Sequence, residues 1–407
     1  MRSEPSKPGK RSVPRATPKP PGNPPRPVKG GKGKPVLKSE PAVVKKPEPT
    51  PEYIIETVPG LEQLAAAEIR ERFPSPPKKE REELGVLRLS FSGKAERLLA
   101  LKLAVAVFRW REHPVPRPTG LLGHQYFSGI LADCKAAIAL HPEGSFTSLR
   151  LAAAGRATEV MARLARELAK ALDLTVDNTG DETQTLLVRL RPLQKKVIKP
   201  PRRRSRDDAP EVDEFYTVWE SLVSLSPRPL STRAWREANY PGAVNACVGY
   251  AMSKLAGDAD RFLNLCAGSG TILIEREQKD AIGCDTSKAA RSAAAINGVE
   301  LKDWDATAVP LDDGWADAIV ADLPFGQRIG SHKDNIKLYP ALLTEAARLL
   351  RVGGTGVFLT HELRLFEDTL GPQWNIERII PLSLGGMHPK LYVVKRVTPK
   401  KVTRPGR

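Results

Sequence analysis

The residues best suited to chemistry are Asp322-Leu-Pro-Phe325, which follow an apolar run at 318–321. The exocyclic amine of a nucleobase is a poor nucleophile because its lone pair is delocalised into the ring, so an enzyme must draw its N–H protons toward acceptors. The Asp322 carboxylate and the Leu323 carbonyl offer such acceptors on one turn, and Pro324 fixes the backbone. Phe325 is suited to stacking on an extruded base. We therefore predict Asp322, Pro324 and Phe325 as catalytic residues; the alternative is a strand-end turn with a core phenylalanine.

A glycine-rich segment, Asn264-Leu-Cys-Ala267-Gly268-Ser-Gly270-Thr, joins another apolar run to a helical pattern. Glycines allow a tight turn and a close approach of a ligand to the backbone, and the helix N-terminus offers unpaired N–H groups. The alternative is a turn with no ligand, because glycines between a strand and a helix are common. A dinucleotide-binding fingerprint would place a third glycine at position 273, where the chain has Leu273, so an oxidoreductase is not favoured.

Two further strand ends carry carboxylates. Asp285 follows the apolar run at 281–284, where it can accept hydrogen bonds from the ribose hydroxyls of an adenosine bound over the glycine turn. It could equally cap the helix that follows. Asp305 lies where a third strand would end, and we favour it over Asp303 as the polar group at the adenine edge.

Short apolar runs alternate with helical patterns between residues 261 and 360. This alternation predicts a parallel sheet with crossover helices on both faces, and ligands of such sheets bind at the carboxyl ends of the strands. The predicted strands end at the segments described above. The elements of the sheet would therefore bring the glycine turn, the two carboxylates and the Asp322 turn to one edge.

The rest of the chain divides by composition. Residues 1–51 are rich in proline and lysine and predict a disordered basic arm. Two α+β modules are predicted at 52–118 and 119–191, a basic linker at 192–212, the sheet domain at 213–396 and a basic tail at 397–407. The net charge of the chain is +17. The arm, the linker and the tail together carry a larger positive charge than this, so the rest of the chain has a small net negative charge. The positive segments favour attraction to a polyanion.

Several classes of protein are excluded. No stretch approaches the roughly 18 apolar residues of a membrane span, and no apolar run follows the charged N-terminus as in a signal peptide. The four cysteines form no CxxC pair and the six histidines are scattered, so no metal site is expected. We expect a cytoplasmic protein with no membrane contact and no metal, acting as a monomer.

The segments NLCAGSGT, GCD, DWDA and ADLPFGQR, in this order and spacing, resemble those of the S-adenosylmethionine-dependent methyltransferases with THUMP domains that form N2-methylguanosine in tRNA. The N-terminal half is similar as well: Thr57-Val-Pro-Gly60-Leu-Glu resembles the opening of the ferredoxin-like domain of that family, and residues 145–190 resemble its THUMP core. Residues 226–243 resemble the lead-in to the catalytic domain.

The resemblance implies an α/β Rossmann-like class I methyltransferase domain with a seven-stranded sheet and an antiparallel last strand at 391–395, preceded by ferredoxin-like and THUMP modules. It implies direct methyl transfer from S-adenosylmethionine to guanine N2 in tRNA, commonly at position 6 of the acceptor stem. The residues that it assigns to the cofactor are Asn264, Ala267, Gly268, Gly270, Asp285, Asp305 and Asp322, and those that it assigns to the base are Asp322 and Phe325.

The sequence departs from the family at Asn264, where an aspartate is usual. The exchange removes a charge near the methionine amine of the cofactor, so weaker cofactor binding is expected. Two alternatives stay open. One is a ribosomal RNA guanine-N2 methyltransferase, and the other is a tRNA-binding protein whose methyltransferase domain is inactive.

Overall fold

The computed structural model describes residues 50–73, 83–177, 184–196, 215–277, 281–325 and 331–399. Residues 1–49 of the predicted basic arm, 197–212 of the predicted linker, 400–407 of the predicted tail and Gly326 lie outside these ranges. Within them, no helix combines the length and the apolar character needed to cross a membrane.

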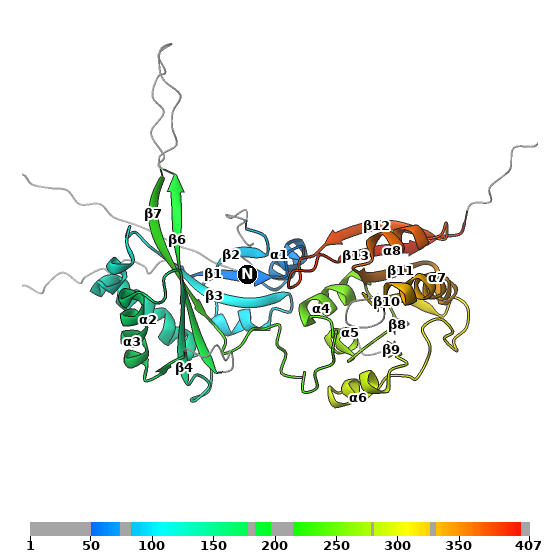
Figure 1. Cartoon of the computed structure of the whole chain (residues 1–407), viewed down its shortest axis with the longest axis horizontal. Coiled ribbons are helices and arrows are strands. Elements are labelled where there is room, and N and C mark those ends of the chain that lie inside the picture. The colour runs from blue at the N-terminus through cyan, green and yellow to red at the C-terminus, as the bar shows by residue number, and fades with distance from the viewer. Residues whose placement is uncertain are drawn as a thin grey trace, which may run out of the picture. The chain divides into compact units, whose positions relative to one another are not determined.

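The N-terminal region forms one mixed sheet with the strand order β2-β1-β3-β7-β6-β4-β5 (Figure 1). Three α-helices lie between its strands in sequence: α1 (Glu62–Arg72), α2 (His124–Ile138) and α3 (Glu159–Leu172). Two short 3-10 helices span Ala95–Ala100 and Pro118–Leu122. The strands are β1 (Glu52–Thr57), β2 (Val86–Ser90), β3 (Ala104–His113), β4 (Ser148–Ala153), β5 (Thr175–Val176), β6 (Thr185–Lys196) and β7 (Phe215–Ser224).

Successive side chains along each strand point to opposite faces of this sheet, and the two faces are covered differently. In β1, Tyr53 and Ile55 point into the core shared with the three helices, whereas Ile54 joins a small cluster on the opposite face. On that opposite face, the guanidinium of Arg88 lies 3.9 Å from the ring centroid of Trp110. The second face is therefore covered by side chains of the sheet itself.

Strand β7 differs from the prediction. Residues 215–224 are predicted to belong to the sheet domain at 213–396, but they pair antiparallel with both β3 and β6 in the N-terminal sheet. The two predicted modules are consequently parts of one sheet rather than two separate units. Strand β7 belongs to this sheet because of backbone hydrogen bonding. Without it, β3 and β6 would each have one edge of unpaired backbone N–H and C=O groups.

The C-terminal sheet has the strand order β12-β13-β11-β10-β8-β9. Neighbouring pairs among β8 to β11 are parallel, and β13 is antiparallel to β11, as expected for the last strand. The strands are β8 (Phe262–Leu265), β9 (Ala281–Gly283), β10 (Ala316–Asp322), β11 (Leu350–Thr360), β12 (Trp374–Pro381) and β13 (Lys390–Arg396).

This sheet has six strands among the described residues, not the seven implied by the resemblance. Within the ranges given above, the pairing beyond β9 continues as a single parallel bridge between Cys284 and Lys302. The chain after Lys302 then leaves the sheet. Asp303 does not continue a strand, and its side chain forms an ion pair with Arg291.

Helices cover both faces of the C-terminal sheet. In β10, Ala318 and Val320 belong to the core on the α4 and α5 side, whereas Ile319 and Ala321 pack with the core that contains α7. Burial on both faces is why this strand reads as a continuous apolar run. The helices are α4 (Ala246–Leu255), α5 (Thr271–Glu275), α6 (Lys288–Ile296), α7 (His332–Leu349) and α8 (Leu363–Thr369).

Candidate active site at the strand ends

A cavity of about 840 Å³ opens at the carboxyl ends of the parallel strands, as predicted for a sheet of this kind. Its walls come from the turn after β8, from the segment after β9, from the end of β10 and from two segments far away in the sequence. Among the predicted site residues, Ala267, Gly268, Asp285, Asp305, Asp322, Pro324 and Phe325 line it. Asn264 and Gly270 are not among the residues that line it.

Asn264 has a structural position inside β8. Its side chain is fully buried, and its Nδ2 donates to the carbonyl oxygen of Val320 on β10, at 3.0 Å, and to that of Leu265, at 3.1 Å. The side chain thus ties two neighbouring strands together. An aspartate here would have no N–H group to donate, so the asparagine suits this position without reference to a ligand.

The two glycines of the turn differ in their surroundings. A Cβ added to Gly270 would lie 2.2 Å from Cγ1 of Val299, so this glycine permits close packing against the segment after α6. Gly268 has a φ of +56°, and no atom lies within 4 Å of the position that its Cβ would occupy. Gly268 therefore supplies a left-handed turn and leaves open space beside the backbone.

Asp285 connects the glycine turn to the segment after β9. Its Oδ2 accepts from the backbone N–H of Gly268 at 2.9 Å, and its Oδ1 accepts from that of Ser287 at 2.8 Å. Each carboxylate oxygen retains a further lone pair for a ligand. Capping the following helix was the alternative role predicted for Asp285. Ser287 caps α6 instead, because its hydroxyl accepts a hydrogen bond from the N–H of Ala290 at the start of the helix.

Asp303 and Asp305 differ in their contacts. Asp303 forms an ion pair with Arg291 at 2.7 Å, and it is absent from the cavity lining. Asp305 lines the cavity, and its Oδ1 accepts hydrogen bonds from the backbone and the hydroxyl of Thr307 at 2.8 and 2.7 Å. Its orientation is thereby fixed within its own turn.

The Asp322 turn is held rigidly by α7. The carbonyl oxygen of Pro324 accepts two hydrogen bonds of 2.8 Å, one from Nδ2 of Asn335 and one from the hydroxyl of Tyr339. The N–H of Leu323 donates to the carbonyl oxygen of Leu359 on β11, at 3.0 Å. These bonds fix the backbone on both sides of the turn, which leaves the Asp322 and Phe325 side chains to face the cavity.

Asp322 combines burial with an unused acceptor. Its Oδ1 is buried and has no hydrogen-bond partner among the described residues. Burial raises the pKa of its carboxyl group to about 7, since an ionised carboxylate is poorly solvated there. An unpaired buried acceptor of this kind is costly for the protein unless a ligand supplies a donor.

Two parts of the cavity wall were not predicted from the sequence. One is the strap at residues 236–245, which is fastened by a hydrogen bond of 2.9 Å from Arg236 to the hydroxyl of Thr271 and by one of 3.3 Å from Tyr240 to Ser287. The other consists of Leu384 and Met387 in the connection between β12 and β13. The resemblance at 226–243 gave a signal for the strap, but no motif marked the second.

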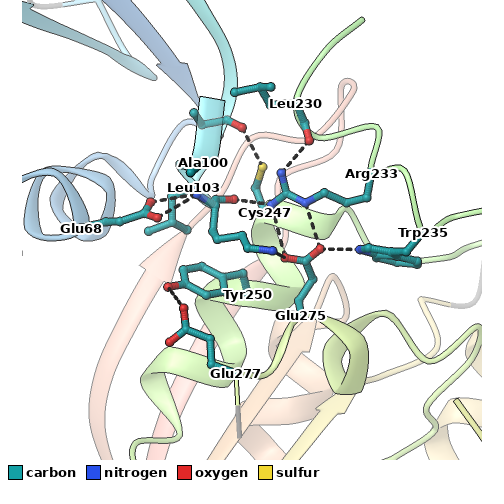
Figure 2. A network of polar contacts seen from close by, with 12 residues as sticks. Glu68, Ala100, Leu103, Leu230, Arg233, Trp235, Cys247, Tyr250, Glu275 and Glu277 are labelled. Atoms are coloured by element: carbon teal, nitrogen blue, oxygen red, sulfur yellow. Dashed lines mark hydrogen bonds and ion pairs between the residues drawn. The ribbon is translucent and has the colours of Figure 1, made fainter. Parts of the chain in front are cut away.

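A buried carboxylate at the end of α5 joins this helix to the segment just before the strap (Figure 2). Glu275, at the end of α5, accepts from Nε of Arg233 at 2.9 Å and from Nε1 of Trp235 at 2.8 Å. Arg233 also donates to the carbonyl oxygen of Lys102 in the N-terminal region, at 2.5 Å. The Glu275 side chain is fully buried, so these partners compensate for its removal from water.

Comparison with known proteins places this geometry among methyltransferases. A family model described as "RMKL-like, methyltransferase domain" matches residues 282–383. The chain is 39% identical to the bovine "tRNA (guanine(6)-N(2))-methyltransferase THUMP3" over 26% of its own length, but the match spans only 22% of that relative. It is 26% identical to the tRNA (guanine(6)-N2)-methyltransferase of Thermus thermophilus, over 84% of this chain and 98% of the relative.

A solved structure gives the same result for the fold. The crystal structure of TrmN from Thermus thermophilus aligns with 85% of this chain and all of its own, with a TM-score of 0.61 and 22% sequence identity. The C-terminal domain therefore has a Rossmann-like class I methyltransferase fold. These matches also confirm the resemblance to the THUMP-containing tRNA guanine-N2 methyltransferases.

Proposed function

We propose that this protein is an S-adenosylmethionine-dependent tRNA (guanine-N2)-methyltransferase. The observation that carries the proposal is the Asp322 carboxyl group, which lines the cavity and has a buried Oδ1 with no partner among the described residues, on a turn that also presents Phe325. Guanine offers N–H donors at its exocyclic amine, which an unpaired carboxylate oxygen is suited to accept. The names of the relatives supply the substrate class, a guanosine of tRNA, and position 6 follows from them.

The residues at the polar end of the cavity fit S-adenosylmethionine. Asp285 keeps lone pairs for the ribose hydroxyls, Asp305 is available at the adenine edge, and open space lies beside Gly268. The cofactor supplies a methyl group on a positively charged sulfur atom. Asp322 adds the negative charge of its ionised form to the same cavity, which favours a cationic ligand.

The chain's own groups then act on the base. The Asp322 carboxylate and the carbonyl oxygen of Leu323 accept the two N–H groups of the guanine amine, which holds the nitrogen lone pair available for the new N–C bond. That bond would form as the bond between the methyl group and the cofactor sulfur breaks, which would leave the sulfur neutral. One N–H proton of the amine is then surplus, and the Asp322 carboxylate takes it. A pKa near 7 suits this carboxyl group to accept a proton and return it to solvent at neutral pH. Phe325 holds the ring by stacking.

The N-terminal region is proposed as the ferredoxin-like and THUMP part that docks tRNA. We retain residues 52–118 and 119–191 as these two modules, with β7 completing their common sheet. The basic arm, linker and tail would contribute phosphate contacts that do not read sequence. We place the protein in the cytoplasm as a monomer.

The main argument for the alternative, a tRNA-binding protein with an inactive methyltransferase domain, is weakened. It depends on the exchange of aspartate for Asn264 in the cofactor site, but Asn264 does not line the cavity in this structure. Its Nδ2 donates to the carbonyl oxygen of Val320 on β10, and its Oδ1 is buried with no partner among the described residues. Ribosomal RNA remains the second candidate substrate, and the same assay decides it.

The test is methylation of unmodified RNA. Purified protein with S-adenosylmethionine should yield N2-methylguanosine from tRNA, measured by nuclease digestion and mass spectrometry. Asp322→Ala should lower turnover by roughly 10²- to 10³-fold, because one acceptor of the transition state is lost, while tRNA binding in a filter assay persists. Methylation of ribosomal RNA in preference to tRNA would support the second candidate, and products methylated only at N1 or C5 would refute both.

A further inference from the structure

The connection between β12 and β13 ends in a tight turn with an apolar residue on each side. Leu384 and Met387 exchange backbone hydrogen bonds of 2.9 and 3.0 Å, so they stand directly opposite each other. Between them, Gly385 and Gly386 both have positive φ, at +55° and +86°, as a type I′ turn requires. Side chains of a directly opposed pair lie on the same face, and here both line the cavity.

The cavity lining differs on the two sides of β8. In the sheet, β9 lies on one side of β8, and β10 and the β12–β13 hairpin lie on the other. Asp285, which is proposed to hold the ribose, comes after β9, whereas Phe325 after β10 and Met387 in the hairpin are aromatic or apolar. Phe325 and Leu384 are both partly buried against the same hydrophobic core. Asp322 adds an acceptor to the β10 side, which therefore suits a flat ring whose edge carries N–H donors.

The hairpin is held in place by the N-terminal region. The N–H of Ser383 donates to the carbonyl oxygen of Pro59 at 3.2 Å, and the guanidinium of Arg378 donates to Gln63 at 3.0 Å. A Cβ added to Gly60 would lie 2.0 Å from the carbonyl oxygen of Pro381. The turn before α1 therefore touches the hairpin backbone so closely that only glycine fits, and the position of the hairpin depends on that contact.

We propose that Leu384 and Met387 form the wall of the base pocket that faces the extruded guanine together with Phe325. This inference rests on the proposed function. Met387 brings a polarisable thioether, which makes favourable contacts with aromatic rings. Because the hairpin is fastened to the region proposed to dock tRNA, the wall is positioned by the same part of the chain that holds the RNA.

The test separates base contact from cofactor contact. Met387→Ala and Leu384→Ala should each lower kcat/KM for tRNA by roughly tenfold or more, as the loss of a base-stacking contact does. The dissociation constants for S-adenosylmethionine and for whole tRNA should change less than twofold. Met387→Leu should restore most of the rate. Ile379→Ala, on the exposed side of β12 and outside the cavity lining, is the matched control and should behave as wild type.

Each outcome of these measurements either supports or contradicts the contact between the hairpin and the base. Equal loss of cofactor affinity in Met387→Ala would place the hairpin at the cofactor end, and unchanged kcat/KM would show that it does not touch the base; either result overturns the inference. If the wild type methylates an RNA base other than guanine, the proposed function fails, but the effect of Met387→Ala on that reaction still decides the inference. A wild-type protein with no activity on any RNA overturns both.

Discussion

Replacing Asp322 by asparagine should make the protein more stable while it removes activity. The carboxyl group has a pKa of about 7 in the folded protein against its usual value of 3.8. Each pKa unit corresponds to about 1.4 kcal/mol between the two protonation states, so the ionised form costs the folded state about 4 kcal/mol above pH 7. The asparagine side chain would not ionise, but its amide N–H groups need partners, and we expect a net gain of about 2–4 kcal/mol at pH 8.

The pH dependence follows from the sign of this pKa change. Below pH 3.8, Asp322 is neutral in both the folded and the unfolded state, so it behaves like an asparagine. Between pH 3.8 and 7, the unfolded state releases its proton while the folded state keeps it, and stability is lost as the pH rises. The advantage of Asp322→Asn should therefore be about 2 kcal/mol larger at pH 8 than at pH 5.5.

Urea unfolding followed by tryptophan fluorescence at the two pH values measures the effect. Asp317→Asn is the matched control at the other end of β10. There, burial opposes ionisation, but hydrogen bonds and charges from Arg351 and Arg261 prevail and hold the pKa of Asp317 below its usual value. This control should destabilise the protein at pH 8. A gain for Asp322→Asn that does not change between pH 5.5 and 8, or a loss at pH 8, would refute the reasoning.

Two further predictions concern the surroundings of the cavity. Glu275→Gln leaves Arg233 buried without its counter-charge and should lower the unfolding free energy by about 3–5 kcal/mol, against under about 1 kcal/mol for Glu277→Gln at an exposed pair; urea unfolding compares them. Asp285→Ala should raise the dissociation constant for S-adenosylmethionine at least tenfold in calorimetry, whereas Asp303→Ala should not change it; equal effects would contradict the ribose assignment.

The sequence was informative about the cavity wherever a side chain stands at a strand end. Asp285 lies just after β9 and Asp322 ends β10, and the ends of parallel strands share one edge, so their convergence could be predicted. Asp305 lines the same cavity although no strand precedes it, only the single bridge at Lys302. Asn264 could not be placed in the same way, because it lies inside β8 and its contacts with β10 decide where its amide points. The wall at Met387 comes from a hairpin far beyond Asp322 in the sequence, with no motif of its own.

In the fold, β7 likewise could not be placed from the sequence. The alternation of apolar runs and helical patterns predicted the parallel strands, because strands buried on both faces read as continuous apolar runs, whereas the antiparallel last strand was expected only from the family resemblance. Residues 215–224 follow a basic segment rich in proline, and composition grouped them with the domain that comes next in sequence. Only the pairing with β3 and β6 shows which sheet they complete, and pairing between distant strands leaves no local signature.

The central position of β7 also sets where the chain can be cut. The strands β2, β1 and β3 on one side and β6, β4 and β5 on the other are joined within the sheet through β7. A fragment that ends at residue 191 would therefore consist of two half-sheets, each with an open edge prone to association with other chains. A fragment that continues through Ser224 keeps the sheet whole, so RNA-binding experiments on the isolated N-terminal region need that strand.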